Sequence, residues 1–272
     1  MDHLTLTSAV MGAIVGAVLG LTGAGGGILA VPLLVFGLHL GMRDAAPIGL
    51  LAVGIGAAIG AALGLREGIV RYRAAAFIGG AGMATAPVAV ALARVAPERP
   101  LLFAFAIVLA LVSWKMFHSS SRAFAEDSQP TPQPCVISLA NGRLVWTTPC
   151  AALLGASGAV SGLLSGLLGV GGGFVIVPVL TRFTNIPAQQ ILATSLAVIS
   201  LVSASGIAAA TFHHAIIWPV AIPFTVGTVA ALLVARTFVT RLDGLVVARA
   251  FSAVSLTAAA MLLLRGLGFM PS

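Results

Sequence analysis

The stretch GLTGAGGGILAVPLL occupies positions 20–34, and a related stretch, GLLSGLLGVGGGFVIVPVL, occupies positions 162–180. Moving the first stretch by 146 residues places nine of its residues on identical residues of the second, so that Gly25–Gly27 fall on Gly171–Gly173 and Pro32 falls on Pro178. The register continues upstream, where Gly12 and Gly16 fall on Gly158 and Gly162. Identity this dense in one register indicates an internal duplication, so we treat the chain as two repeats.

The composition indicates a protein embedded in the lipid bilayer. Hydrophobic residues make up 59% of the 272 positions and charged residues only 8%, against roughly 25% charged residues in soluble domains. The net charge of +7 does not indicate nucleic-acid binding, because the arginines are spread singly over loops and form no basic face. We therefore expect a polytopic membrane protein with no nucleic-acid partner.

Ten apolar segments recur along the chain, five in each repeat. They lie at about 6–22, 28–41, 45–65, 74–94 and 100–117, and again at about 150–168, 173–183, 190–211, 217–235 and 246–268. Most are long enough to cross a hydrocarbon core of roughly 30 Å. The segments after each glycine triplet are shorter and could be tilted spans or arms of re-entrant hairpins. The predicted fold class is all-α, with two homologous repeats, about 8–10 spans and glycine-broken helices at the centre.

A hydrophilic stretch, SSSRAFAEDSQPTPQPC at 119–135, separates the two repeats. Its polar and acidic residues cannot pack in lipid, which indicates a solvated linker. We therefore divide the chain into a first transmembrane repeat at 1–118, a linker at 119–148 and a second transmembrane repeat at 149–272. Cys135 and Cys150 bracket this region. We expect incidental thiols, because a disulfide here would require a linker outside the cytoplasm.

The basic residues predict which side of the membrane the linker faces. If all ten segments cross, one side receives Arg66, Arg71, Arg73, Lys115, Arg122, Arg143, Arg182, Arg236 and Arg241, and the other receives Arg43, Arg94, Arg99 and Arg265. The first side, with the linker, is then expected to be cytoplasmic. Five spans per repeat is an odd number, so the repeats would be inverted about the membrane plane. Re-entrant short segments would instead give four spans and parallel repeats. We favour the inverted arrangement.

The repeated glycine motif is the strongest candidate for a functional site. Consecutive glycines disfavour a regular helix by about 1 kcal/mol each, and Pro32 and Pro178 remove a further backbone donor, so both motifs are expected to break a helix. Paired breaks in two repeats point to a central transport site. A helix that restarts after the glycines presents free N–H groups and the positive end of its dipole, which suits a small anion. Close helix packing is the alternative role for glycines, and it fits Gly12, Gly16, Gly54, Gly56, Gly60 and Gly64.

Hydroxyl side chains near the motifs are candidate substrate ligands, although most such hydroxyls bond back to their own helix. Thr22 and Ser165 flank the glycine clusters, and further polar residues follow the second: Gln189, Gln190, Thr194, Ser195, Ser200, Ser203 and Ser205. The predicted substrate-binding set is Thr22, Gly25, Gly26, Gly27, Gly171, Gly172, Gly173, Thr194 and Ser195. No acidic residue falls inside a long apolar segment, and no catalytic, metal-binding or cofactor-binding pattern is found. We therefore expect no enzymatic activity, no metal and no cofactor.

The paired Gly-Gly-Gly-x-x-x-Val-Pro motifs resemble those of the TauE/SafE sulfite exporter family, also called the toluene-sulfonate uptake permeases. The run Ala193-Thr194-Ser195-Leu196 and the later Ile217-Trp218 are also similar to that family. The resemblance covers nearly the whole chain. It implies a multi-pass permease of the cell inner membrane that moves sulfite, sulfonates or related organosulfur anions, with the glycine motifs and Thr194-Ser195 as functional positions. The first repeat has Pro47-Ile48-Gly49-Leu50 at the equivalent place, so we expect an asymmetric site.

We therefore expect a permease that moves a small, sulfur-containing anion by alternating access around the two glycine breaks, with a homo-oligomer as one form it could take. The alternative is a non-transporting membrane scaffold or assembly subunit whose glycines only pack helices. A channel is a further alternative, which currents far above carrier turnover would distinguish.

Overall fold

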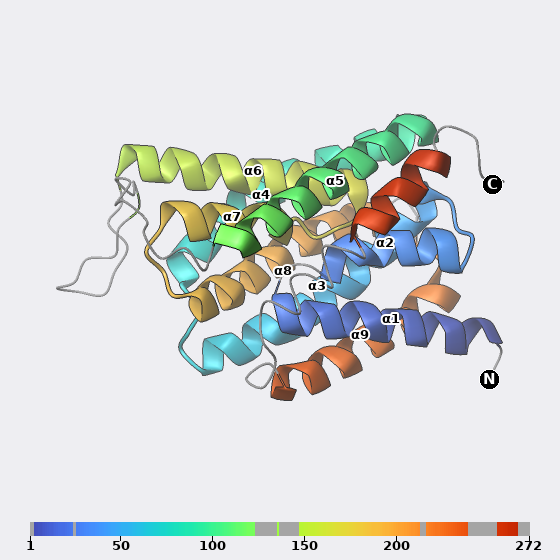
Figure 1. Ribbon diagram of the computed structural model, residues 1–272, viewed down its shortest axis with the longest axis horizontal. Helices are drawn as coiled ribbons and strands as arrows, with labels where there is room; N and C mark the ends of the chain where they lie inside the picture. The colour runs from blue at the N-terminus through green and yellow to red at the C-terminus, as the bar shows by residue number, and fades with distance from the viewer. Residues whose placement is uncertain are drawn as a thin grey trace.

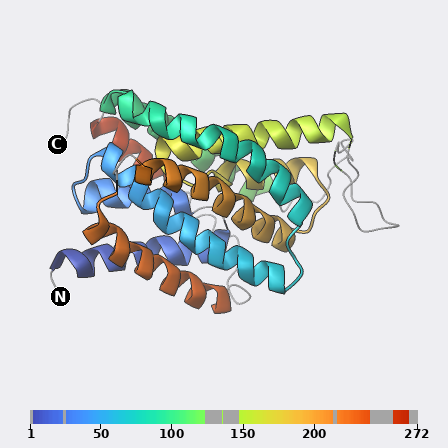
Figure 2. The ribbon, with the colours of Figure 1, turned by 180° about the vertical axis from the view of Figure 1, so that it is seen from behind.

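The computed structural model describes residues 3–23, 26–122, 135, 147–212, 216–238 and 255–265, and its regular secondary structure is helical. Its elements are α1 (His3–Thr22), α2 (Gly26–Gly37), α3 (Met42–Arg66), α4 (Tyr72–Val95), α5 (Glu98–Arg122), α6 (Thr148–Leu168), α7 (Gly173–Phe183), α8 (Ala188–Phe212), α9 (Trp218–Phe238) and a C-terminal helix, Ser255–Arg265. The helices lie side by side, roughly along the long axis of the molecule (Figures 1 and 2). In the described part of the chain, six helices are long and apolar enough to cross a membrane: α1, α3, α4, α6, α8 and α9. The predicted all-α membrane fold is confirmed.

Each glycine motif lies where the first helix of a hairpin ends and the second begins. Gly26 at the start of α2 packs against Leu19 and Val15 of α1, and Gly37 at its end packs against Met11, so the two helices are antiparallel. α6 and α7 form the equivalent hairpin in the second repeat (Figure 1). α2 has 12 residues and α7 has 11, which at 1.5 Å per residue is roughly half of a bilayer core. The short segments are therefore hairpin arms, and not full spans.

The helices that follow the two hairpins, α3 and α8, run in opposite directions. Each hairpin begins and ends at the same end of the molecule (Figure 1), so it leaves the sidedness of every later loop unchanged. The equivalent helices α3 and α8 pack in the core of the protein, where Gly54 meets Ser203, Gly60 meets Leu196 and Leu50 meets Gly206. Residue numbers rise along α3 as they fall along α8. These equivalent helices are therefore antiparallel.

Two rows of glycines, which we call the glycine stripes, pack the two repeats together through equivalent helix–helix contacts. Gly12, Gly16 and Gly20 of α1 meet Phe224, Thr228 and Leu232 of α9. At positions displaced by 146 residues, Gly158, Gly162 and Gly166 of α6 meet Ile78, Gly82 and Ala86 of α4. Each stripe pairs one helix of the first repeat with one helix of the second. A Cβ atom on these glycines would collide with the partner's backbone, so the missing side chains set the distance between the helices.

The linker is attached to the body of the protein by a disulfide between Cys135 and Cys150. Cys150 lies in the first turn of α6, where its N–H donates to the side chain of Thr147. Cys135 also forms an isolated β-bridge with Thr184, directly after α7. The expectation of incidental thiols was therefore wrong, because the fold brings the two cysteines together. α5 ends at Arg122, and residues 123–134 and 136–146 of the predicted linker lie outside the described residues.

Candidate functional site

The two glycine motifs meet in the middle of the molecule. A Cβ atom on Gly27 would collide with the carbonyl of Val170, which belongs to the second motif. Val53, halfway along α3, lies beside both Gly27 and Gly171. The structure thus brings together glycines that are far apart in the sequence, as a central site requires. Gly25 lies outside the described residues.

The turn between α6 and α7 is built by residues in the left-handed region. Gly169, Gly171 and Gly172 have φ angles of 73°, 74° and 69°, a conformation that costs side-chain-bearing residues roughly 1–2 kcal/mol each. A Cβ atom on Gly172 would also collide with Ser161, whose hydroxyl donates to the carbonyl of Gly172 at 3.0 Å. Glycine is therefore required here by both conformation and space.

The helices break at the glycines and not at the prolines. α6 ends at Leu168 and α7 begins at Gly173, while Pro32 and Pro178 lie inside α2 and α7, which continue through them. The assignment of these prolines as helix breaks is corrected in that respect. Each proline still removes one N–H donor from its helix.

The start of α7 presents buried backbone donors. Gly171, Gly172, Gly173 and Phe174 are all buried, and the first N–H groups of a helix have no acceptor within that helix. These donors, together with the positive end of the helix dipole, suit a negatively charged group. α2 begins in the same way, with Gly26 and Gly27 buried against α1 and the second motif.

The three predicted hydroxyl ligands bond to protein groups, and two of them, Thr22 and Ser195, lie at the first glycine turn. Thr22 donates to the carbonyl of Val18 within α1 at 2.8 Å. Thr194 accepts the backbone N–H of Arg71 at 3.0 Å, and Ser195 donates to the carbonyls of Leu192 at 2.8 Å and Gly23 at 3.2 Å. The residues of α8 beside the second glycine turn are instead Ile199 and Ser203, further along the helix. A role for Thr22, Thr194 and Ser195 in substrate binding stays a prediction.

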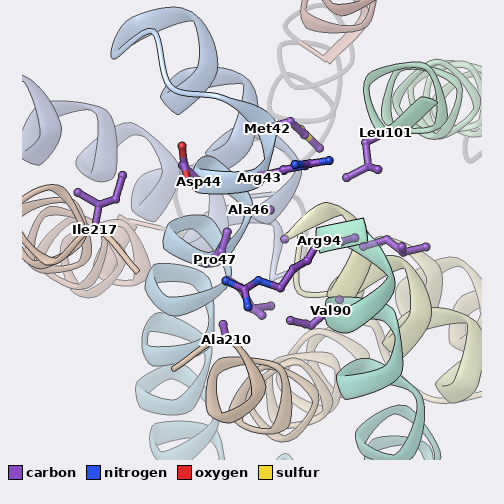
Figure 3. Close-up of a pocket in the computed structure, with 15 residues that line it drawn as sticks. Met42, Arg43, Asp44, Ala46, Pro47, Val90, Arg94, Leu101, Ala210 and Ile217 are labelled. Atoms are coloured by element: carbon purple, nitrogen blue, oxygen red, sulfur yellow. The ribbon is translucent and has the colours of Figure 1, made fainter. Parts of the chain in front are cut away.

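A cavity of about 360 Å³ opens at the end of the molecule where α3 begins. Figure 3 shows it between α3, α4, α5, α6 and α8, with Arg94 extending beside Pro47 and Ala210. Its polar lining residues Arg43, Asp44 and Arg94 are exposed, and its wall includes Gly166 and Gly169 at the end of α6. The cavity therefore connects one end of the protein with the second glycine turn. No motif marks these charged residues in the sequence.

The equivalent positions at the opposite end are joined by hydrogen bonds. Counting by 146, the cavity residues Asp44, Val90 and Ile217 correspond to Gln190, Arg236 and Arg71. There, Arg71 Nε donates to Gln190 Oε1 at 2.9 Å, and its backbone N–H donates to Thr194.

The same end carries a second set of bonds between the repeats. Arg236 Nη1 donates to the carbonyl of Gly60 at 3.0 Å, and Arg236 Nη2 bonds both carboxylate oxygens of Glu67 at 2.9 and 3.0 Å. We call Arg71, Gln190, Thr194, Arg236 and Glu67 the closed-end network. It links α4 to α8 and α9 to α3, so every bond in it crosses from one repeat to the other.

Comparison with known proteins adds to this geometry. The family description "Sulfite exporter TauE/SafE" matches residues 8–262. The chain belongs to this family. Among curated relatives, a "Probable membrane transporter protein" of Xylella fastidiosa strain 9a5c is 30% identical over 219 residues, which are 79% of this chain and 77% of the relative. The protein of the same name from strain Temecula1 / ATCC 700964 is 28% identical over 222 residues, with the same coverage. No solved structure matches the chain.

Membership of the TauE/SafE family confirms the resemblance carried by the glycine motifs. Together with the long apolar helices, it identifies this chain as a multi-pass membrane transporter. The family match runs through both hairpins and both glycine stripes.

Proposed function

We propose that this TauE/SafE protein carries a small anion across the membrane by alternating access, with the two glycine turns at the centre of the path. The difference between the two ends of the molecule supports this proposal. A cavity reaches Gly169 from one end, whereas the closed-end network joins the equivalent positions at the other. A carrier of this design exposes a central site to one side at a time. In these terms the cavity is the open access path, and the network holds the opposite path closed.

The charge of the proposed substrate follows from the donors at the centre. Val53 lies beside Gly27, the second residue of α2, and beside Gly171, two residues before α7, so the positive dipole ends of these helices lie near one another. The open cavity carries Arg43 and Arg94 against the single acid Asp44, which favours the approach of an anion. The family's description as a sulfite exporter supports a sulfur-containing anion such as sulfite or a sulfonate.

We further propose that the two repeats are inverted about the membrane plane. The antiparallel packing of the equivalent helices α3 and α8 supports this arrangement. The two glycine stripes, which repeat the same contact at an offset of 146 residues, support it as well. An inverted pair gives a transporter two equivalent access paths that can open in turn.

Selective binding of an anion is the first test of the function. Purified protein should melt at a higher temperature as sulfite, thiosulfate, methanesulfonate or acetate is titrated, because a ligand at one hundred times its Kd adds about 2.7 kcal/mol of stability. The same anion should then exchange across proteoliposomes that contain the protein. If no anion stabilises a well-folded sample, the transport proposal fails and the scaffold alternative gains support.

The side of the membrane that the linker faces can be read from Cys135 and Cys150. The basic residues place this end in the cytoplasm, whereas a stable disulfide is expected outside it, so the two signals disagree. We propose the cytoplasmic side, because the basic residues are spread over several separate loops and the disulfide concerns a single pair. In the cytoplasm the Cys135–Cys150 disulfide of the structure would be reduced to two adjacent thiols, so its redox state in cells reports the side that the linker faces.

Alkylation of whole cells distinguishes these assignments. When cells are quenched in acid, denatured and treated with a polyethylene-glycol maleimide without reductant, we expect both cysteines to react. The chain has two cysteines, so the protein should gain two mass tags. A protein that takes up tags only after reduction would place the linker outside the cytoplasm.

A further inference from the structure

Ser203 carries a buried hydroxyl that has no hydrogen-bond partner. Its side chain is 0% exposed, and its Oγ has no partner in the described structure. Other hydroxyls of α8 behave differently: Ser200 and Ser205 donate to the carbonyls of Ala197 and Val202 in their own helix. Leaving a buried hydroxyl unpaired destabilises the folded protein. Its presence in the core therefore calls for an explanation.

The hydroxyl lies beside Gly171, in the turn that leads into α7. A Cβ atom on Gly171 would be 3.8 Å from Ser203 Oγ. Gly171 and Gly172, both with positive φ, lead into the buried start of the helix, whose first N–H groups have no acceptor one full helical turn back. An unpaired, buried hydroxyl thus lies next to the turn that leads into the start of a helix. A buried hydroxyl without a partner beside a helix start, which favours negatively charged groups, indicates a ligand that brings acceptor atoms.

The position is central in the fold and specific to one repeat. Gly54, near the middle of α3, packs against Ser203, close to the point where the antiparallel α3 and α8 cross. The equivalent residue in the first repeat is Ala57, which is buried and has no hydroxyl. The second glycine turn therefore has a side-chain donor that the first lacks.

We propose that Ser203 donates a hydrogen bond to an oxygen of the transported anion, which binds at the start of α7. This inference rests on the proposed function and names a substrate-contacting residue within that same site. The chemistry fits a small oxyanion, such as the head group of a sulfonate, a sulfite or a carboxylate, because hydroxyl and N–H donors at a helix start both stabilise negative charge. Val53 and Ile199 lie against Gly171, so their side chains must shift when the anion is bound.

The test compares Ser203→Ala with matched alanine variants on the same helix. Wild type, Ser203→Ala, Ser200→Ala and Ser205→Ala are titrated by thermal shift with sulfite, methanesulfonate and acetate. Whichever probe stabilises the wild type should bind Ser203→Ala at least tenfold more weakly, and should bind the two control variants as it binds the wild type. Without a probe, Ser203→Ala should melt at the wild-type temperature or above it, because the variant removes an unpaired buried hydroxyl.

The outcomes separate this inference from the proposed function. If a probe binds wild type and Ser203→Ala equally well, Ser203 is no ligand, and the anion transporter stands without it. If the unliganded Ser203→Ala melts well below wild type, the hydroxyl has a structural role and the inference is overturned. If no probe stabilises the wild type, the anion proposal itself fails, and this inference fails with it.

Discussion

An Arg71→Ala, Arg236→Ala double variant is expected to expose the closed end of the protein. The two arginines supply the side-chain donors that bond Gln190, Gly60 and Glu67 across the repeats. A hydrogen bond to a charged group contributes about 1.5–3 kcal/mol. Arg236 and Glu67 are partly exposed, so we take the lower end of that range. Each 1.4 kcal/mol changes a population roughly tenfold, so the open form of this end should become at least about ten times more populated.

Cysteine labelling measures this change directly. Ala193 lies beside the closed-end network and is 6% exposed, and its equivalent in the first repeat is Pro47, which lines the open cavity. In a Cys135→Ser, Cys150→Ser background, Ala193→Cys should react slowly with a maleimide and Pro47→Cys quickly. In the double arginine variant, the rate at Ala193→Cys should rise and the rate at Pro47→Cys should fall.

A charge-matched control separates gating from simple loss of positive charge. Arg66 and Arg73 lie at the same end of the molecule and are exposed, so their double alanine variant removes the same charge and leaves the network intact. It should label as the wild type does. An unchanged rate at Ala193→Cys in the Arg71, Arg236 variant would show that the network does not hold this end closed. A rise at both reporters would indicate a loosened protein or a channel, and not alternating access.

The all-helical fold was predictable because it depends on local properties of the chain. The apolar segments at 45–65 and 190–211 correspond closely to α3 and α8, since the length of an apolar stretch is read directly from the sequence. The glycine turns were predictable for the same reason, as three consecutive glycines lower helix stability wherever they occur. The hairpin geometry could not be predicted, because a segment of 11–14 residues fits either a tilted span or the returning arm of a hairpin.

The candidate site was predictable only in part. Its side chains come from helices that are far apart in the sequence, and the way these helices pack decides which side chains meet. Thr194 and Ser195 were ranked above Ser203 as ligands, yet the contacts place Ser203 beside Gly171 and Thr194 beside Arg71. That difference depends on where α8 crosses α3, which no local pattern specifies. A position-by-position comparison of the repeats would have pointed to the closed end as different from the open end. Arg71 and Arg236 at the closed end correspond to the apolar residues Ile217 and Val90 at the open end.

A single methyl group added to either glycine stripe is expected to destabilise the folded protein. A Cβ atom on Gly16 would collide with the carbonyl of Thr228, and one on Gly162 with the carbonyl of Gly82 and the hydroxyl of Thr85. The helices would have to separate, which strains hydrogen bonds such as that from Thr228 to Gly12 at 3.0 Å. Forcing extra atoms into a packed contact typically costs 1–3 kcal/mol, so Gly16→Ala and Gly162→Ala should each melt several degrees below the wild type.

Gly80→Ala provides the matched control for this prediction. Gly80 lies in α4, close in sequence to Gly82, but a Cβ atom there would meet nothing within 4 Å. Alanine favours a helix over glycine by about 1 kcal/mol, so Gly80→Ala should melt at the wild-type temperature or above it. Equal decreases in melting temperature for Gly16→Ala and Gly162→Ala would show that the two stripes contribute equally to stability, as equivalent contacts in a duplicated fold should. A wild-type melting temperature for both variants would mean that these glycines do not set the helix separation, and the packing that holds the two repeats together would have to lie elsewhere.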